Sequence, residues 1–301
     1  MHFSWWPRAA LPVDLMLNKG PVMKILVPSD FSINSNNAAL YAAKFAKKVN
    51  AEIILFHIVH FEHPPMVQVS EAVEQKIENI RISNASKDCV LLVNDLKSKV
   101  KGIQISFKVV TGFPIADVIE NYATANQIDL IIMGTKGASG LAKVLFGSNA
   151  VNLINISSIP IITLPAYAQF SNLKQIVYAS DTYVIAEMHP RIQKIIFIAQ
   201  LFNASIYILH VLSQYDSDKK IDVVKIKDTL INKYKYEKIS FQVFRLYDDV
   251  VEAINDFVVH KNADLLAMYT HELGFFESLF KTSFNREMAF HSSVPLLTIK
   301  K

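Results

Sequence analysis

The sequence predicts two α/β domains in tandem, each built on a mainly parallel sheet. Three observations support this prediction. Apolar runs of strand length alternate with segments of helical periodicity, the pattern of a parallel sheet with helical crossovers. The whole alternation occurs twice along the 301 residues. Hydrophobic residues make up 51% of the chain and the mean hydropathy is +0.24, yet no apolar run reaches the roughly 18 to 20 residues of a membrane-spanning helix. The apolar excess is therefore expected in strands buried on both faces.

In the first half, five apolar runs of strand length are separated by four helical segments. The first run, KILVP at 24–28, precedes alanines and a phenylalanine at helical spacing. Pro114 opens the third helical segment, since proline is favoured in a first turn. Strands are expected at 24–28, 52–59, 103–110, 129–133 and 160–164, and helices at 34–49, 70–100, 114–126 and 148–156.

The second half repeats the first, segment by segment. The run KQIVYASD that ends at Asp181 corresponds to KILVPSD, which ends at Asp30. The later segments DLLAM and SSVPL correspond to DLIIM and SSIPI at one common offset of 135 residues, so the chain between them aligns without a gap. We expect a domain at 24–165, a linker at 166–173 and a second domain at 174–301. Residues 1–23 contain both tryptophans and show no hydrophobic periodicity, and they are expected to be a non-native or misassigned extension.

Charge and cysteine content restrict the function classes. The net charge is only +4 and the basic residues are scattered, so no nucleic-acid partner is expected. The chain has one cysteine, Cys89, so it cannot form an intramolecular disulfide, which fits a reducing cytoplasm. Because no apolar run is long enough to span a bilayer, no membrane association is expected. Neither H-E-x-x-H, C-x-x-C nor G-x-S-x-G occurs, so neither a metal site nor a catalytic residue is expected.

Glycine is concentrated in one place. Of eight glycines in the chain, four (Gly134, Gly137, Gly140 and Gly147) lie within fourteen residues, between an expected strand and an expected helix. Backbone amides beside a helix N-terminus bind anions. The motifs G-x-x-x-x-G-K-[ST] and G-x-G-x-x-G are absent. The segment is interpreted as a phosphate-binding loop, and the alternative is a glycine-rich turn without a ligand.

The spacing Gly134-x2-Gly137-x9-Gly147-Ser148 resembles that of the ATP-binding universal stress proteins, the UspA family. The segment VPSDFS, which contains Asp30, and the turn TGFP before the third helix resemble the same family. The motifs extend over 24–165, and the second half follows by internal homology. The resemblance implies a Rossmann-like, doubly wound five-stranded sheet of order 3-2-1-4-5 in each domain.

The resemblance also implies ATP as the ligand, with Mg²⁺. Asp30 and Ile58 would hold adenine and ribose, although Asp30 could instead be a helix cap or loop residue. Lys136 could approach the phosphates or be an ordinary exposed lysine. The remaining implied residues shape the pocket or hold the phosphates: Pro28, Ser29, Met133, Gly134, Gly137, Gly147, Ser148 and Asn149.

The second domain departs from this pattern. Tyr269, Glu272 and Thr282 stand at the positions of Gly134, Gly137 and Gly147, and only Ser283 is retained. Side chains would fill the space that phosphate needs, so we expect ATP in the first domain alone. His57 and His210 recur at equivalent positions and are interpreted as partly buried strand histidines.

The sequence therefore predicts a cytoplasmic, ATP-binding, nucleotide-dependent switch or scaffold in the stress response. The alternatives are a nucleotide-free interaction module of the same fold and a slow adenine-nucleotide hydrolase. The apolar strands at 161–164 and 296–299 would both be sheet edges, which need to be covered. We expect them to lie together in an internal pseudo-dimer, and the apolar surface favours a further homodimer.

Overall fold

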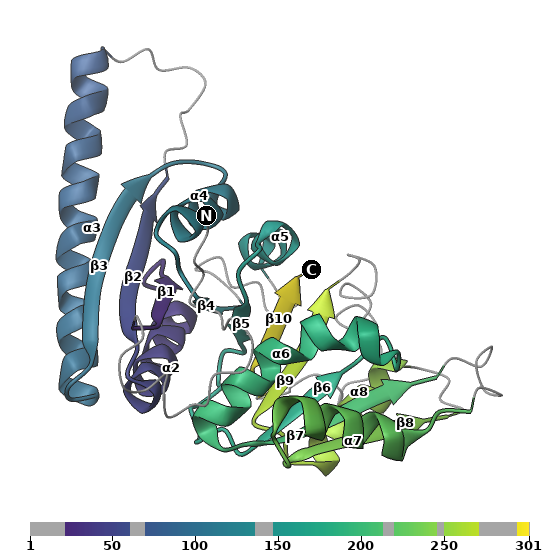
Figure 1. Cartoon of the computed structure of the whole chain (residues 1–301). Coiled ribbons are helices and arrows are strands. Elements are labelled where there is room, and N and C mark those ends of the chain that lie inside the picture. The colour runs from purple at the N-terminus through teal and green to yellow at the C-terminus, as the bar shows by residue number, and fades with distance from the viewer. Residues whose placement is uncertain are drawn as a thin grey trace. The chain divides into compact units, whose positions relative to one another are not determined.

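The computed structural model describes residues 22–60, 70–135, 147–212, 220–245, 250–270 and 294–300, in two compact units that divide between Ile159 and Pro160 (Figure 1). The elements of the unit Val22–Ile159 are β1 (Lys24–Pro28), α2 (Ile33–Val49), β2 (Glu52–Val59), α3 (Glu71–Lys99), β3 (Gln104–Thr111), α4 (Ile115–Ala125), β4 (Leu130–Gly134) and α5 (Ser148–Ile156). Those of the other unit are β5 (Ile161–Leu164), β6 (Gln175–Ala179), α6 (Ile185–Phe202), β7 (Ser205–Val211), α7 (Val223–Tyr234), β8 (Ile239–Phe244), α8 (Val250–His260), β9 (Leu265–Thr270) and β10 (Leu296–Lys300).

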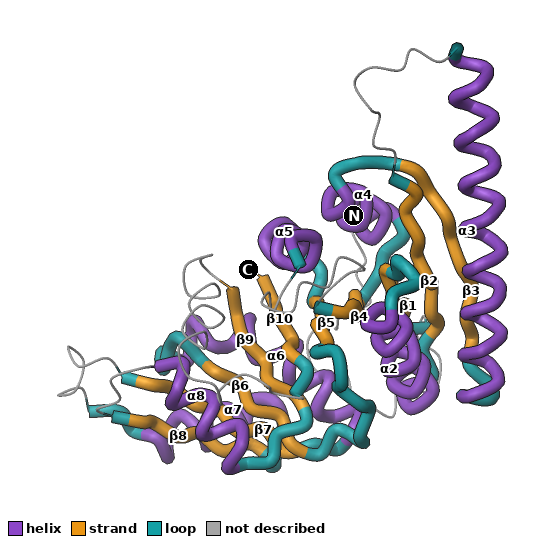
Figure 2. The backbone as a smooth tube through the Cα atoms, turned by 180° about the vertical axis from the view of Figure 1, so that it is seen from behind, coloured by secondary structure: helices purple, strands orange, loops and turns teal. Residues whose placement is uncertain are grey.

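In the unit Val22–Ile159, the strands lie in the order β3-β2-β1-β4 and all pair in parallel. Ile25 of β1 lies between Ile53 of β2 and Leu130 of β4, and all three side chains are buried. Helix α2 packs on α3, and α4 packs on α5. Right-handed crossovers place these two pairs on opposite faces of the sheet, an arrangement that can be followed from behind in Figure 2. The core strand β1 therefore ends in a crevice beside β4.

The other unit has the order β5-β10-β9-β6-β7-β8. Its pairs are parallel except for β5 and β10, which are antiparallel. Thr163 lies opposite Leu296 and donates its hydroxyl to that residue's carbonyl at 3.3 Å. Thr298 does the same to Ile161, also at 3.3 Å. Because both hydroxyls are buried, the reciprocal bonds keep them satisfied inside an apolar strand pair.

The sequence prediction of an α/β fold with tandem repeats is confirmed, as is the order 3-2-1-4-5 for the first repeat. Two strands, 24–28 and 52–59, have the predicted bounds, and the other predicted strands differ by one residue at one or both ends. The expected adjacency of the two terminal strands is present as the β5–β10 pair. The domain boundaries stay a prediction, and residues 1–21 lie outside the described part of the chain.

Candidate functional site

A cavity of about 160 Å³ lies in the unit Val22–Ile159, at the carboxyl ends of β1 and β4. Nine residues identified in the sequence line it: Pro28, Ser29, Asp30, Ile58, Met133, Gly134, Gly147, Ser148 and Asn149. The other two, Lys136 and Gly137, lie outside the described residues. Small-molecule sites typically measure about 300 to 1,000 Å³, so these walls enclose only part of a nucleotide-sized ligand.

The turn from β1 to α2 presents Asp30 at the cavity. Ser32 caps α2, because its Oγ accepts a hydrogen bond from the backbone N–H of Ser35 at 3.2 Å. Asp30 is exposed, and its Oδ1 accepts from the backbone N–H of Ser32 at 3.1 Å. Between them, Phe31 has a left-handed φ of 61°. Asp30 is therefore not the helix cap itself, but it does support the turn, so part of its role is structural.

His57 fastens this turn to β2. Its Nδ1 donates to the carbonyl oxygen of Ser29 at 2.8 Å, which assigns the proton to Nδ1 because a carbonyl can only accept. The ring also stacks on Phe31 with centroids 4.5 Å apart. His210 repeats the bond in the second repeat, to the carbonyl of Ser180 at 2.8 Å. Both histidines are thus positioned to hold a loop, in keeping with their interpretation as strand histidines.

Gly134 makes a close contact at the floor of the site. A Cβ at this position would lie 3.1 Å from the carbonyl oxygen of Asn34 and 3.2 Å from its carbonyl carbon. Both atoms are backbone atoms of the first turn of α2. Glycine at the end of β4 therefore lets β4 and α2 approach each other, a packing role separate from the phosphate contact that the family resemblance implies.

The N-terminus of α5 forms another wall. Gly147 is the N-cap and donates its amide to the carbonyl of Thr135 at 2.6 Å. Ser148 is the first helical residue, and within the described part of the chain no side-chain hydrogen bond caps this end. Gly147, Ser148 and Asn149 all line the cavity. A helix N-terminus carries a partial positive charge and unpaired amides, which suits an anion such as phosphate.

Apolar side chains make up much of the remaining wall of the cavity. Such a wall would suit the flat apolar face of a nucleotide base. Six lining residues were not identified in the sequence: Ser35, Phe56, Ile115, Ile119, Thr135 and Ala150. Each lies within a few residues of an identified one or on the first turns of α4. The signal that could have found them is their position at strand ends and helix starts along the same sheet edge.

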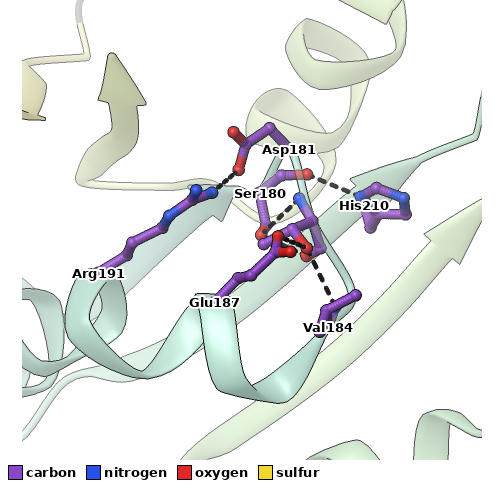
Figure 3. A network of polar contacts seen from close by, with 7 residues as sticks. Ser180, Asp181, Val184, Glu187, Arg191 and His210 are labelled. Atoms are coloured by element: carbon purple, nitrogen blue, oxygen red, sulfur yellow. Dashed lines mark hydrogen bonds and ion pairs between the residues drawn. The ribbon is translucent and has the colours of Figure 1, made fainter. Parts of the chain in front are cut away.

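The equivalent edge of the second repeat is arranged differently. Asp181, the counterpart of Asp30, is ion-paired with Arg191 of α6 (Figure 3). The Arg191 guanidinium also lies over the ring of Tyr269, 4.7 Å from its centroid. Glu272, Thr282 and Ser283, the other positions compared in the sequence, lie outside the described residues.

One perturbed carboxyl lies away from the cavity. Asp129 precedes β4, at the opposite end of the strand from Gly134, and accepts from the backbone N–H of Lys24 at 2.8 Å. Burial raises the pKa of Asp129 to about 6. Its bond to the start of β1 indicates a structural role. Within the described residues, no cluster of three or more His, Cys, Asp or Glu could hold a metal, and no helix is long and apolar enough to span a membrane.

Comparison with known proteins gives one family for both halves. The model of the universal stress protein family matches residues 21–165 and 176–300. Universal stress protein MJ0531 of Methanocaldococcus jannaschii is 27% identical over 141 residues, 47% of this chain and 81% of the relative. Universal stress protein YxiE of Bacillus subtilis is 26% identical over 144 residues, 46% of this chain and 96% of the relative.

Two solved structures share the fold over nearly the whole chain. A universal stress protein from Archaeoglobus fulgidus has a TM-score of 0.64 at 19% identity, covering 92% of this chain and 98% of its own. A putative universal stress protein from Pseudomonas aeruginosa has a TM-score of 0.58 at 14% identity, covering 95% of each chain. These two likenesses concern the fold alone.

Proposed function

This chain belongs to the universal stress protein family, and from that premise we propose that its first repeat binds ATP in the cavity between β1 and β4. The observation that carries the proposal is that residues from separate segments of the chain line the same cavity. Asp30, Ile58, Met133 and Ser148 come from four separate segments of the chain, and all of them line one cavity. The second repeat would not bind ATP, because a guanidinium and a tyrosine ring lie at its equivalent positions.

Each wall suits a different part of the nucleotide. The apolar side chains of Phe56, Ile58 and Met133 would contact the base, and the Asp30 carboxylate can accept hydrogen bonds from ribose hydroxyls. The N-terminus of α5 would hold phosphate oxygens through its amides. The described residues contain no ready metal cluster, so an accompanying Mg²⁺ would be held mainly by phosphates and water.

Isothermal titration with ATP tests this proposal, together with hydrogen exchange to locate the ligand. We expect one ATP per chain and protection of the β1–α2 turn and of α5. Asp30→Asn should weaken binding by about tenfold, since a charge-assisted bond to the ribose becomes a neutral one. Two ATP molecules per chain, or protection at β9, would contradict binding by the first repeat alone.

The role that follows is a cytoplasmic switch or scaffold whose partner contacts depend on bound nucleotide. A chain that binds no nucleotide in the titration would instead be an interaction module. A chain that turns over bound ATP within minutes would be a hydrolase. A long incubation with ATP, read out as released phosphate, separates these alternatives from the proposed slow or absent hydrolysis.

We also propose that the β5–β10 pair is the centre of an internal pseudo-dimer. The support is the reciprocal bonding of Thr163 and Thr298 across the antiparallel pair. Each hydroxyl bonds a carbonyl of the other strand, as a local two-fold axis requires. Thr163→Val together with Thr298→Val should destabilise the β5–β10 pair by about 1 kcal/mol per hydrogen bond, because the carbonyl acceptors of Leu296 and Ile161 remain when the hydroxyls are removed. The sedimentation mass of the whole chain would show whether two chains associate further.

A further inference from the structure

Arg191 is the seventh residue of α6, and its side chain is only 11% exposed. Its Nη1 donates to Oδ1 of Asp181, at the end of β6, as Figure 3 shows. Its guanidinium carbon lies 4.7 Å from the ring centroid of Tyr269 in β9, a cation–π distance. One buried cation therefore contacts the ends of two neighbouring strands of the second repeat.

The two groups that Arg191 contacts correspond to known walls of the first cavity. Asp181 aligns with Asp30, and Tyr269 aligns with Gly134, and both of these residues of the first repeat line the cavity. A guanidinium held between Asp181 and Tyr269 hence occupies the space in the second repeat that corresponds to the cavity of the first.

The helices show where the guanidinium comes from. Helices α2 and α6 both end at a left-handed asparagine, Asn50 and Asn203. Counting back twelve residues from each cap places Arg191 of α6 at the position of Ala38 in α2. Ala38 is fully buried and contributes only a methyl group to the helix–sheet contact. At this helix position the first repeat thus has the methyl group of Ala38. The second repeat has the Arg191 side chain, which is long enough for its guanidinium to reach the ends of β6 and β9.

We infer that Arg191 is an internal cationic ligand of the second repeat, filling the crevice that corresponds to the nucleotide cavity of the first. The ligand class that this crevice accepts is an alkylguanidinium, which pairs with a carboxylate and lies on an aromatic face. The second repeat is then complete without any nucleotide. This inference goes beyond the proposed function, and its tests use no nucleotide, so failure of ATP binding would not affect them.

The first test compares the two equivalent aspartates in the full-length chain. Asp181→Asn leaves the Arg191 guanidinium, whose side chain is 11% exposed, without its counter-charge. Because the Asp181 side chain is itself 44% exposed, solvent screens part of that loss, which lies between the cost for an exposed pair and that for a buried pair. We expect hydrogen exchange of β6 and β9 amides to accelerate by about tenfold. The matched variant Asp30→Asn keeps an amide oxygen that can still accept the backbone N–H of Ser32, and β1 and β4 exchange should change by less than about threefold. Equal effects in the two repeats would overturn the inference.

The second test supplies the ligand from solution. Arg191→Ala should lower the melting temperature, and ethylguanidinium at low millimolar concentration should restore part of the loss. The double variant Arg191→Ala, Asp181→Asn should show no such recovery, because the carboxylate that anchors the ion is absent. If Arg191→Ala does not fold by itself, its refolding yield should rise with ethylguanidinium. Absence of rescue in both measurements would refute a guanidinium site.

Discussion

Replacement of Gly134 by alanine tests whether this glycine is needed for packing. The added Cβ would lie 3.1 Å and 3.2 Å from backbone atoms of Asn34, where ordinary contacts are 3.4 to 4 Å. Backbone cannot rotate away as a side chain can, so β4 and α2 must separate by a few tenths of an ångström. Overpacking of this kind costs about 1 to 3 kcal/mol.

An opposing contribution has to be subtracted. Gly→Ala at a compatible backbone conformation stabilises a protein by about 0.4 to 1 kcal/mol, because the unfolded chain loses freedom. The midpoints of the two ranges, about 2 and about 0.7 kcal/mol, leave an expected net loss for Gly134→Ala of about 1.3 kcal/mol. Urea unfolding followed by circular dichroism, with hydrogen exchange of β1 and β4, measures it. ATP affinity should also fall, since the first turn of α2 carries Ser35, which lines the cavity.

Gly112→Ala provides the control. Its Cβ would meet Cγ2 of Val118 at 2.7 Å, a side-chain atom, so truncation to Gly112→Ala, Val118→Ala should recover the part of the loss that this contact causes. The remainder should persist, because Gly112 has a φ of 155°, which residues with a Cβ rarely adopt. Asn34→Ala should recover nothing for Gly134→Ala, because the crowded atoms are backbone atoms. A Gly134→Ala variant that is as stable as the parent, or more stable, would refute the close approach of β4 and α2.

Three further outcomes are expected. Gly137→Glu, which copies the second repeat, should abolish ATP binding in a titration while circular dichroism shows the fold retained, and unchanged affinity would mean that the glycine segment is only a turn. Because burial raises the pKa of Asp129 to about 6 from 3.8, the folded state holds the proton more tightly, so stability should fall as the pH rises from about 4 to 6. Asp129→Asn should remove that dependence and gain about 1 to 2 kcal/mol at pH 7 in urea unfolding, after allowance for solvent screening, and an unchanged pH profile would contradict this. Cys89 is buried with its pKa raised to about 11, so a thiol reagent at pH 7.5 should label it only in urea, and rapid labelling of the folded chain would show otherwise.

Local pattern in the sequence predicted most of the fold. The apolar run at 24–28 and the alternation around it indicate strands, since a strand's burial is visible in its own residues. The internal repeat predicted the second sheet in the same way. The spacing of Gly134, Gly147 and Ser148 identified a site whose described members line one cavity, because parallel strands deliver their carboxyl ends to one edge.

The sequence by itself thus determined the tandem α/β architecture, the strand order expected from family resemblance and the location of the candidate nucleotide site. The tertiary structure alone decided what each residue contacts. Gly134 is crowded by Asn34, a hundred residues earlier, and Arg191 reaches Asp181 and Tyr269 on two different strands. The alternation of buried and exposed residues, and the residue types that form turns, depend on neighbours in the chain. A close approach of two backbones, or an ion pair between residues of different elements, depends on which elements the fold brings together.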